Sequence, residues 1–207
     1  MRRIQKTIAP QEFIDFRKNM PGTGFGNLSG EPKNALRKRL LEDQGYICCY
    51  CGQRIDDDNT KIEHIKPQKY FPELSLDFNN MLASCDGGEK DRNGGAKKNI
   101  HGIHCDAKKG NRSIPVSPLE DIEGLFCYFA DGTVNGTGEG DDLVNILGLN
   151  TQFLVHKRKA AINNYEIFPP QNWHEEYQRL SYRQEDGKFV EFCFVLQSYI
   201  KLKYLGD

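Results

Sequence analysis

Four cysteines constrain the fold of this 207-residue chain more than any other feature. Cys48 and Cys51 form a Cys-x-x-Cys pair that is followed by Gly52, and Cys85 and Cys105 lie downstream. Two thiolates at the first spacing can bind one Zn²⁺ ion, and two more complete a closed, tetrahedral structural site. The separator of 19 residues between Cys85 and Cys105 is wide for such a site. The alternative is therefore that these last two are ordinary buried thiols.

The remaining cysteines and the overall composition narrow the class of protein. The chain has seven cysteines, an odd count, and no apolar segment follows its charged start at residues 1–6. These features favour metal binding over a disulfide scaffold and predict a cytoplasmic protein without a signal peptide or membrane span. Cys49 is expected to point away from the metal, because neighbouring residues alternate in direction. Cys127 and Cys193 lie in apolar runs and are expected in the core.

The chain divides into three segments by composition. Residues 1–45 form an N-terminal helical segment, in which Leu36, Leu40 and Leu41 make the apolar stripe of a helix that follows Ser29 and stops at Gly45. Residues 46–112 carry most of the cysteine and histidine and are expected to form the core of the functional site. Residues 113–207 are expected to form a mostly helical extension that docks a partner.

The pattern within these segments predicts individual elements. A strand is expected through residues 62–65, an apolar segment at 81–83, and an inserted, mobile loop at 86–103. In the rear segment a hairpin turn is expected at Asp131 and Gly132, and a helical stretch from 141 to 164 is expected to break near Gly148. Two further helices are expected at 173–183 and 189–203.

Charge is distributed unevenly along the chain. Residues 1–112 contain 20 Lys and Arg against 15 Asp and Glu, whereas residues 113–207 contain 8 against 14. A basic front half could face a polyanion while the acidic rear half faces solvent or a partner, and the alternative is a chance imbalance.

Three short motifs lie between and beside the cysteines. The first is Glu63-His64 followed by Ile-Lys-Pro, the second is Asn80, five residues before a cysteine, and the third is the segment Cys-Asp-Ala-Lys-Lys-Gly at 105–110. In this order the motifs resemble those of the HNH nucleases, which have the ββα-metal (His-Me finger) fold. The helix end Leu-Leu-Glu-Asp-Gln-Gly, the Cys-Tyr-Cys knuckle and the rear segment 145–163 are similar to those of the nucleases of retron and Septu anti-phage defence systems.

The resemblance implies an α+β fold with a ββα-metal core, zinc knuckles that supply four cysteine ligands, and flanking helices. It implies His64 as the general base that activates water, Glu63 and Asp106 as ligands of a catalytic Mg²⁺ or Mn²⁺ ion, and Asn80 as a residue that orients the histidine. The sequence departs from the family at Glu63, where Asp is usual, and at Asp106, where His or Asn is usual. His104 is a rival ligand. Neighbours on a strand point to opposite faces, so only the resemblance brings Glu63 and His64 to one site.

Basic residues around these motifs are expected to contact the phosphate groups of a nucleic acid. Those expected near phosphate are Lys66, Lys108, Lys109 and Arg112. The resemblance also implies DNA as the substrate and an ATPase partner of the ABC/SMC-like kind. Two alternatives stay open: the target is RNA, or the chain is a non-catalytic, zinc-stabilised module that binds nucleic acid or protein.

Overall fold

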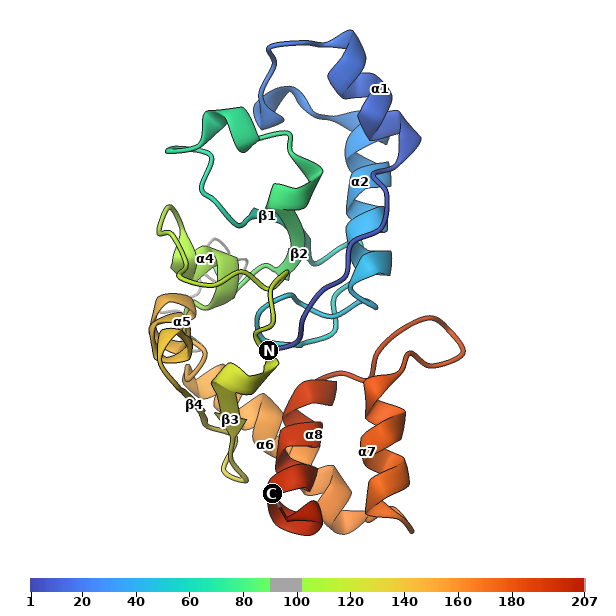
Figure 1. Ribbon diagram of the computed structural model, residues 1–207, viewed down its shortest axis with the longest axis vertical. Helices are drawn as coiled ribbons and strands as arrows, with labels where there is room; N and C mark the ends of the chain where they lie inside the picture. The colour runs from blue at the N-terminus through green and yellow to red at the C-terminus, as the bar shows by residue number, and fades with distance from the viewer. Residues whose placement is uncertain (90–101, 207) are drawn as a thin grey trace.

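Helices and two small antiparallel sheets make up the fold, seen here in a computed structural model that describes residues 1–89 and 102–206. Figure 1 shows an elongated molecule with the first helices and the first sheet at one end and the last helices at the other. The α+β character predicted from the sequence is confirmed at this level. Most of the predicted loop at 86–103 lies outside the described residues.

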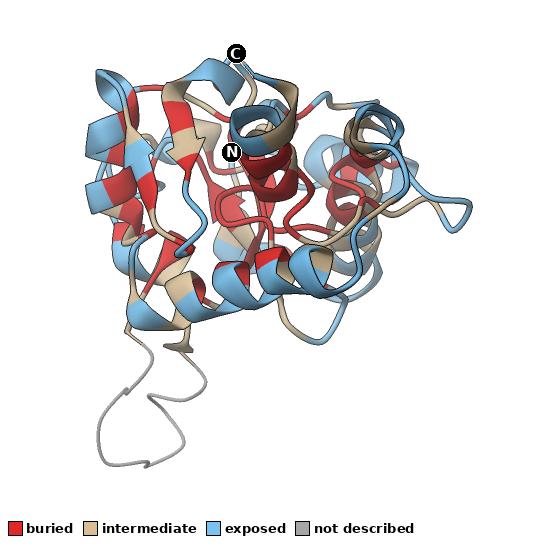
Figure 2. Cartoon of the chain, turned by 90° about the horizontal axis from the view of Figure 1, so that it is seen from below, coloured by how far each residue is buried: buried red, intermediate tan, exposed pale blue. Residues whose placement is uncertain are grey.

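The first end of the molecule is organised by α1 (Gln11–Asn19) and α2 (Gly30–Asp43), which pack against each other. The leucine stripe of α2 is fully buried, and the helix stops where Gly45 takes a left-handed conformation, as predicted. Figure 2 shows buried residues on the inward faces of the helices and exposed ones outside.

The first sheet is a pair of antiparallel strands, β1 (Thr60–His64) and β2 (Met81–Cys85). The register pairs Glu63 with Leu82, and β1 ends at His64, one residue before the predicted end at Ile65. The connection contains the 3₁₀ turns Pro72–Leu74 and Phe78–Asn80.

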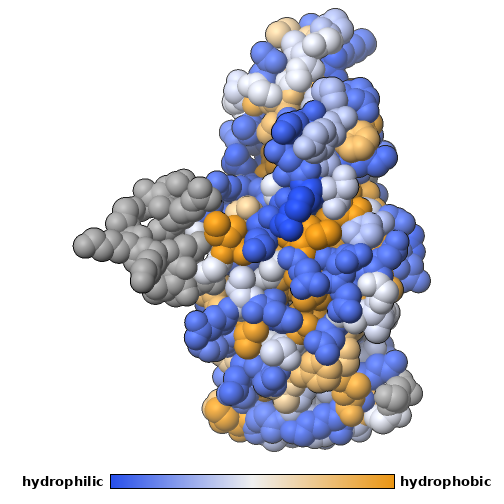
Figure 3. Space-filling model, turned by 90° about the vertical axis from the view of Figure 1, so that its left-hand side faces the viewer, coloured by the Kyte–Doolittle hydropathy of each residue, from blue (hydrophilic) through white to orange (hydrophobic). Residues whose placement is uncertain are grey.

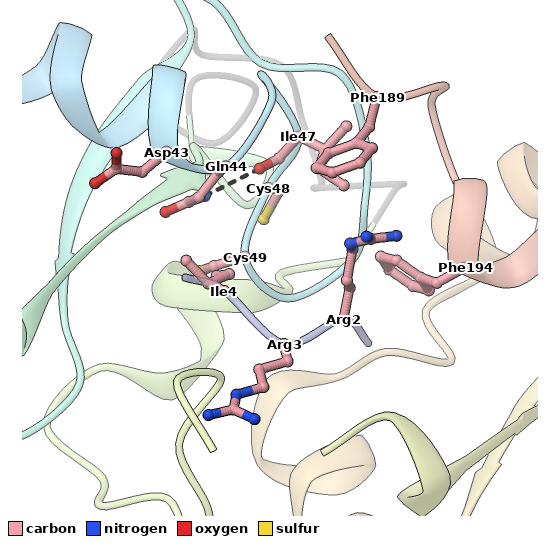
Figure 4. Close-up of a pocket in the computed structure, with 10 residues that line it drawn as sticks. All are labelled: Arg2, Arg3, Ile4, Asp43, Gln44, Ile47, Cys48, Cys49, Phe189 and Phe194. Atoms are coloured by element: carbon pink, nitrogen blue, oxygen red, sulfur yellow. Dashed lines mark hydrogen bonds between the residues drawn. The ribbon is translucent and has the colours of Figure 1, made fainter. Parts of the chain in front are cut away.

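The Gln44 side chain connects α2, the cysteine knuckle and β2. Its Nε2 donates to the carbonyl groups of Ile47 at 3.0 Å and Ala83 at 2.7 Å, and its Oε1 accepts from the Ala83 amide at 2.7 Å. The first of these bonds is drawn in Figure 4, where Cys48 and Cys49 line a pocket beside the N-terminal segment. A buried amide with all three partners satisfied fixes the knuckle against the sheet.

The short helix α4 (Cys105–Lys109) packs against β2, although residues 86–104 separate the two elements in sequence. The His104 amide donates to the Gly87 carbonyl at 3.1 Å, which brings the two chain segments together. Gly87 has φ +63°, and a Cβ there would lie 2.2 Å from the His104 carbonyl oxygen, so only glycine fits this turn.

The described part of the rear segment contains a β-hairpin and four α-helices. The hairpin of β3 (Phe126–Tyr128) and β4 (Val134–Gly136) turns at Asp131 and Gly132, as predicted. The helices are α5 (Glu139–Leu147), α6 (Gln152–Ile167), α7 (Trp173–Ser181) and α8 (Cys193–Ile200). Gly148, in the left-handed region, separates α5 from α6, which confirms the predicted break. None of the described helices is long and apolar enough to cross a membrane.

The predicted helix at 189–203 was wrong at its start, because Phe192 has φ +58° and α8 begins only at Cys193. The preceding residues instead bond to the knuckle region, defined here as residues 45–52: the Phe189 amide donates to the Gly45 carbonyl and the Phe192 amide to the Gly52 carbonyl. A Cβ on Gly45 or Gly52 would lie within 2.5 Å of a phenylalanine ring, so the rear segment packs directly on the first half.

Candidate functional site

The four predicted cysteine ligands lie together in one buried cluster. The Sγ atoms of Cys48, Cys51, Cys85 and Cys105 are all within 4.8 Å of one another. The Cys48–Cys105 and Cys51–Cys85 sulfur distances are both 3.9 Å. Four sulfurs bound tetrahedrally at about 2.3 Å from a zinc ion would be about 3.8 Å apart. The cluster could therefore hold a metal ion such as zinc, and Cys85 and Cys105 are not isolated buried thiols.

Charge in the cluster also suits a cation. The pKa of Cys48 is well below its usual value, because hydrogen bonds from the other thiols outweigh the opposite effect of burial. Burial, followed by the hydrogen bonds from the other three thiols, raises the pKa of Cys105 well above its usual value. A divalent ion would bind all four sulfurs as thiolates and release any protons that they carry.

The other cysteines lie outside this cluster. Cys49 lines the pocket in Figure 4, and Cys193 is fully buried, as predicted. The expectation that Cys127 is in the core was wrong, because it lies on the outward side of β3 and is half-buried.

His104 lies beside the thiols rather than beside Glu63. Its Nδ1 is 3.3 Å from the Gly102 carbonyl oxygen, its ring stacks on Phe153 at 5.6 Å between centroids, and it hydrogen-bonds to Cys85. Burial lowers its pKa, but the Cys85 interaction more than compensates, so the net pKa is raised. These contacts make His104 a second layer around the cysteine cluster.

Glu63 and Asp106 form a carboxylate pair. The two side chains are hydrogen-bonded, and burial, followed by the hydrogen bond and the charge of Glu63, raises the pKa of Asp106 to about 8. Glu63 is buried, and its Oε1 accepts from the Tyr50 hydroxyl at 2.7 Å and from Lys109 Nζ at 2.8 Å. Two adjacent carboxyl groups provide the oxygen ligands that a hard divalent cation prefers.

His64 is buried at the end of β1 with both ring nitrogens engaged. Nε2 is 3.0 Å from the Ser75 carbonyl oxygen, which can only accept, so Nε2 carries the proton and Nδ1 is the acceptor in the neutral ring. The Gln68 amide lies 3.2 Å from Nδ1, and the edge of the ring contacts Phe25. Burial lowers the pKa of His64, which keeps it neutral at physiological pH.

The side chains of Glu63 and His64 contact different residues, as expected for neighbours on a strand. The imidazole contacts Ser75 and Gln68, while Asp106 and Lys109 act on it through their charges. Lys109 links the two residues, because its Nζ also donates to the His64 carbonyl at 2.7 Å.

Asn80 holds the chain that follows His64. Its Oδ1 accepts from the Lys66 amide at 2.8 Å, and its Nδ2 donates to the carbonyl groups of Lys66 at 3.0 Å and Leu74 at 3.2 Å. The Ile65 amide donates to the Asn80 carbonyl at 2.9 Å. The loop that carries Gln68 and Ser75 is therefore fixed relative to the histidine.

The four basic residues expected near phosphate have different surroundings. Lys66 and Lys108 are exposed. Arg112 donates to the carbonyl groups of Lys108, Lys109 and Ile146, and so caps α4. The expectation for Lys109 was wrong, because its side chain is 1 % exposed and bonds to Glu63. Figure 3 shows the face with α4 and α5, on which hydrophilic residues predominate around scattered hydrophobic ones.

Sequence reasoning missed the groups that contact the motif residues from elsewhere in the chain. These are Tyr50, Phe25, Gln68, Ser75 and the inward role of Lys109. Tyr50 had one local signal, its place between two cysteines of the knuckle. The others depend on tertiary contacts that no spacing reveals.

The fold and its cysteine cluster define a protein that could hold a metal ion such as zinc, and known proteins share its sequence features. No family model matches the chain. The chain is 34 % identical over 99 residues to a protein of retron Ec83 from Escherichia coli, described as a candidate HNH endonuclease, with 42 % of this chain and 38 % of that protein covered. It is 25 % identical over 169 residues to the corresponding retron Vc95 protein of Vibrio cholerae serotype O1 biovar El Tor, with 76 % and 78 % covered.

A third relative is the Septu protein PtuB of Bacillus thuringiensis, 31 % identical over 122 residues, with 57 % of this chain and 42 % of PtuB covered. The chain thus spans about two fifths of the length of PtuB and of the retron Ec83 protein. The resemblance to HNH proteins of retron and Septu systems that the sequence motifs indicated is confirmed.

Proposed function

We propose that this protein is a metal-dependent HNH endonuclease that hydrolyses phosphodiester bonds of DNA in anti-phage defence. One observation carries the proposal: Glu63, which pairs with Asp106, is followed directly on β1 by His64, whose Nε2 carries the proton, so that Nδ1 is the ring nitrogen able to accept one. We propose further that β1, β2 and α4 form its ββα-metal core, with zinc bound to the four cysteines. The similarity to retron and Septu proteins supports this proposal.

Each residue of the site would have a separate role in the hydrolysis. His64 Nδ1 would accept the proton of the attacking water, once Gln68 gives up its hydrogen bond to that nitrogen. The Ser75 carbonyl holds Nε2–H and so fixes the tautomer, and Asn80 fixes the loop that contains Ser75. Glu63 and Asp106 would hold a Mg²⁺ or Mn²⁺ ion, which when bound stabilises charge on the phosphate and on the leaving oxygen. Lys66 and Lys108, both exposed, would contact phosphate groups.

Nicking of supercoiled plasmid DNA with Mg²⁺ tests the proposal. His64→Ala should lower the rate by at least ~100-fold, because general base catalysis contributes this much. His156→Ala changes an exposed histidine of α6 and serves as the matched control, which should leave the rate unchanged. Equal rates for wild type and His64→Ala would contradict the proposed role.

The same assay separates the two alternatives. Cleavage of RNA but not of DNA would make this an RNA-cleaving HNH effector. No cleavage of either by the wild type, with an ABC/SMC-like ATPase of the same defence system present, would favour a zinc-stabilised binding module. We propose such an ATPase as the partner because the Septu resemblance implies it, and independent elution of the two proteins at micromolar concentrations would count against it.

A further inference from the structure

Tyr50 lies between the cysteine cluster and the carboxylate pair. Its neighbours Cys49 and Cys51 are part of the knuckle, and its side chain is fully buried. The knuckle backbone around it is held by two hydrogen bonds, from the Cys48 amide to the Gln53 carbonyl at 2.8 Å and from the Cys49 amide to the Ala83 carbonyl at 3.1 Å. The phenol ring therefore has little freedom to move independently of the cysteines.

The Tyr50 hydroxyl and the Lys109 ammonium meet on the same atom, Glu63 Oε1, at 2.7 Å and 2.8 Å. A carboxylate oxygen that accepts two short, buried hydrogen bonds has used both of its lone pairs. The other oxygen, Oε2, is then the atom of Glu63 that remains for a cation shared with Asp106. With Oε1 engaged in this way, Glu63 would hold a cation through Oε2.

Tyr50, Lys109 and Asp106 all belong to segments that contain cysteines of the cluster. Tyr50 belongs to the knuckle of Cys48 and Cys51, while Asp106 and Lys109 belong to α4, whose first residue is Cys105. Loss or distortion of the cysteine cluster would therefore displace the groups that surround Glu63.

We propose, on the basis of the proposed function, that Tyr50 is a positioning residue that couples the zinc knuckle to the catalytic metal site by holding Glu63 for single-oxygen coordination of Mg²⁺ or Mn²⁺. Small divalent cations of this class bind carboxylates through one oxygen in octahedral geometry, whereas Ca²⁺ accepts bidentate carboxylates. Tyr50 thus sets both the strength and the selectivity of cation binding without touching the substrate.

Calorimetric titration of Mn²⁺ and Ca²⁺ into the zinc-loaded protein tests the proposal. Tyr50→Phe keeps the volume and removes only the hydroxyl, and we expect it to weaken Mn²⁺ binding by about tenfold, as for other residues that orient metal ligands. Ca²⁺ binding should fall less, because Oε1 becomes available. Tyr165→Phe is the matched control: it removes another phenol-to-carboxylate hydrogen bond, to Glu176 at 2.5 Å, and should leave both affinities unchanged.

Two further measurements exclude a merely structural effect. Zinc content should remain one ion per chain in Tyr50→Phe, and the rate of plasmid nicking at saturating Mn²⁺ should return to that of wild type. An unchanged Mn²⁺ affinity in Tyr50→Phe, or an equal loss at every Mn²⁺ concentration, would overturn the proposal. Loss of zinc from the folded variant would overturn it too.

The proposal and the proposed function can fail separately. Mn²⁺ binding that Glu63→Gln abolishes and Tyr50→Phe weakens, in a protein that cleaves no nucleic acid, would support the positioning role and refute the nuclease. Normal cleavage by Tyr50→Phe at limiting Mn²⁺ would refute the positioning role and leave the nuclease intact.

Discussion

Replacing Asp106 by asparagine is expected to stabilise the zinc-loaded protein when no Mg²⁺ or Mn²⁺ is added. In the folded protein burial and Glu63 raise the pKa of Asp106 from 3.8 to about 8. Between these values the unfolded chain releases the proton and the folded chain retains it, so stability falls as pH rises from about 4 to about 8 and is level above. Asparagine cannot ionise and can donate its amide to Glu63, so the variant lacks this loss.

The size of the effect follows from the pKa difference. The loss of stability begins at the unfolded-state pKa of 3.8, so at pH 7 it has accumulated over about three pH units. At 1.36 kcal/mol per unit, the upper limit of the loss in unfolding free energy is about 4 kcal/mol. Asp106 is only half-buried, and screening by water reduces this to about 2 kcal/mol.

Urea unfolding followed by circular dichroism at pH 6, 7, 8 and 9 measures the difference. Asp106→Asn should exceed wild type by about 2 kcal/mol at pH 7, and the gap should widen up to pH 8 and then stay constant. Asp142→Asn, at an exposed aspartate of α5, is the control and should follow wild type. Equal midpoints for wild type and Asp106→Asn at pH 7 and pH 9 would refute this account of the carboxylate pair.

Three other outcomes are expected. Below pH 8 a proton competes with the cation at Asp106, so Mn²⁺ affinity should fall by up to ~10-fold per pH unit towards pH 6; calorimetry in buffers of different ionisation enthalpy would show the released proton. Cys85→Ser should lower zinc content and the melting temperature together, as measured by mass spectrometry and calorimetry. Arg158→Met should cost about 3 kcal/mol in urea unfolding, because three acceptors lose their buried donor, whereas the exposed Lys159→Met should cost nothing measurable.

Local patterns predicted most of the elements. The leucine stripe of α2 and its glycine stop, the turn at Asp131 and Gly132, and the break at Gly148 are all determined by neighbours in sequence. The start of α8 was missed because Phe192 takes a left-handed conformation while it packs against the knuckle region. A contact between residues more than 130 positions apart leaves no periodic signal.

The same division applies to the site. The four cysteines were predicted as a set, and the structure brings them together. The burial of Lys109 was not predicted, because two adjacent lysines at the end of a short helix are typical of a solvent-exposed surface. Its inward direction depends on the meeting of α4 with β1, which no local pattern encodes.

The contact of Phe189 and Phe192 with the knuckle region has a consequence for biosynthesis. The backbone carbonyl groups of Gly45 and Gly52 accept hydrogen bonds from the amides of residues 189 and 192, so the knuckle cannot reach its final packing until residue 192 has left the ribosome. If the protein cuts nucleic acid, a nascent polypeptide shorter than 192 residues would lack this support of the knuckle beside the proposed site.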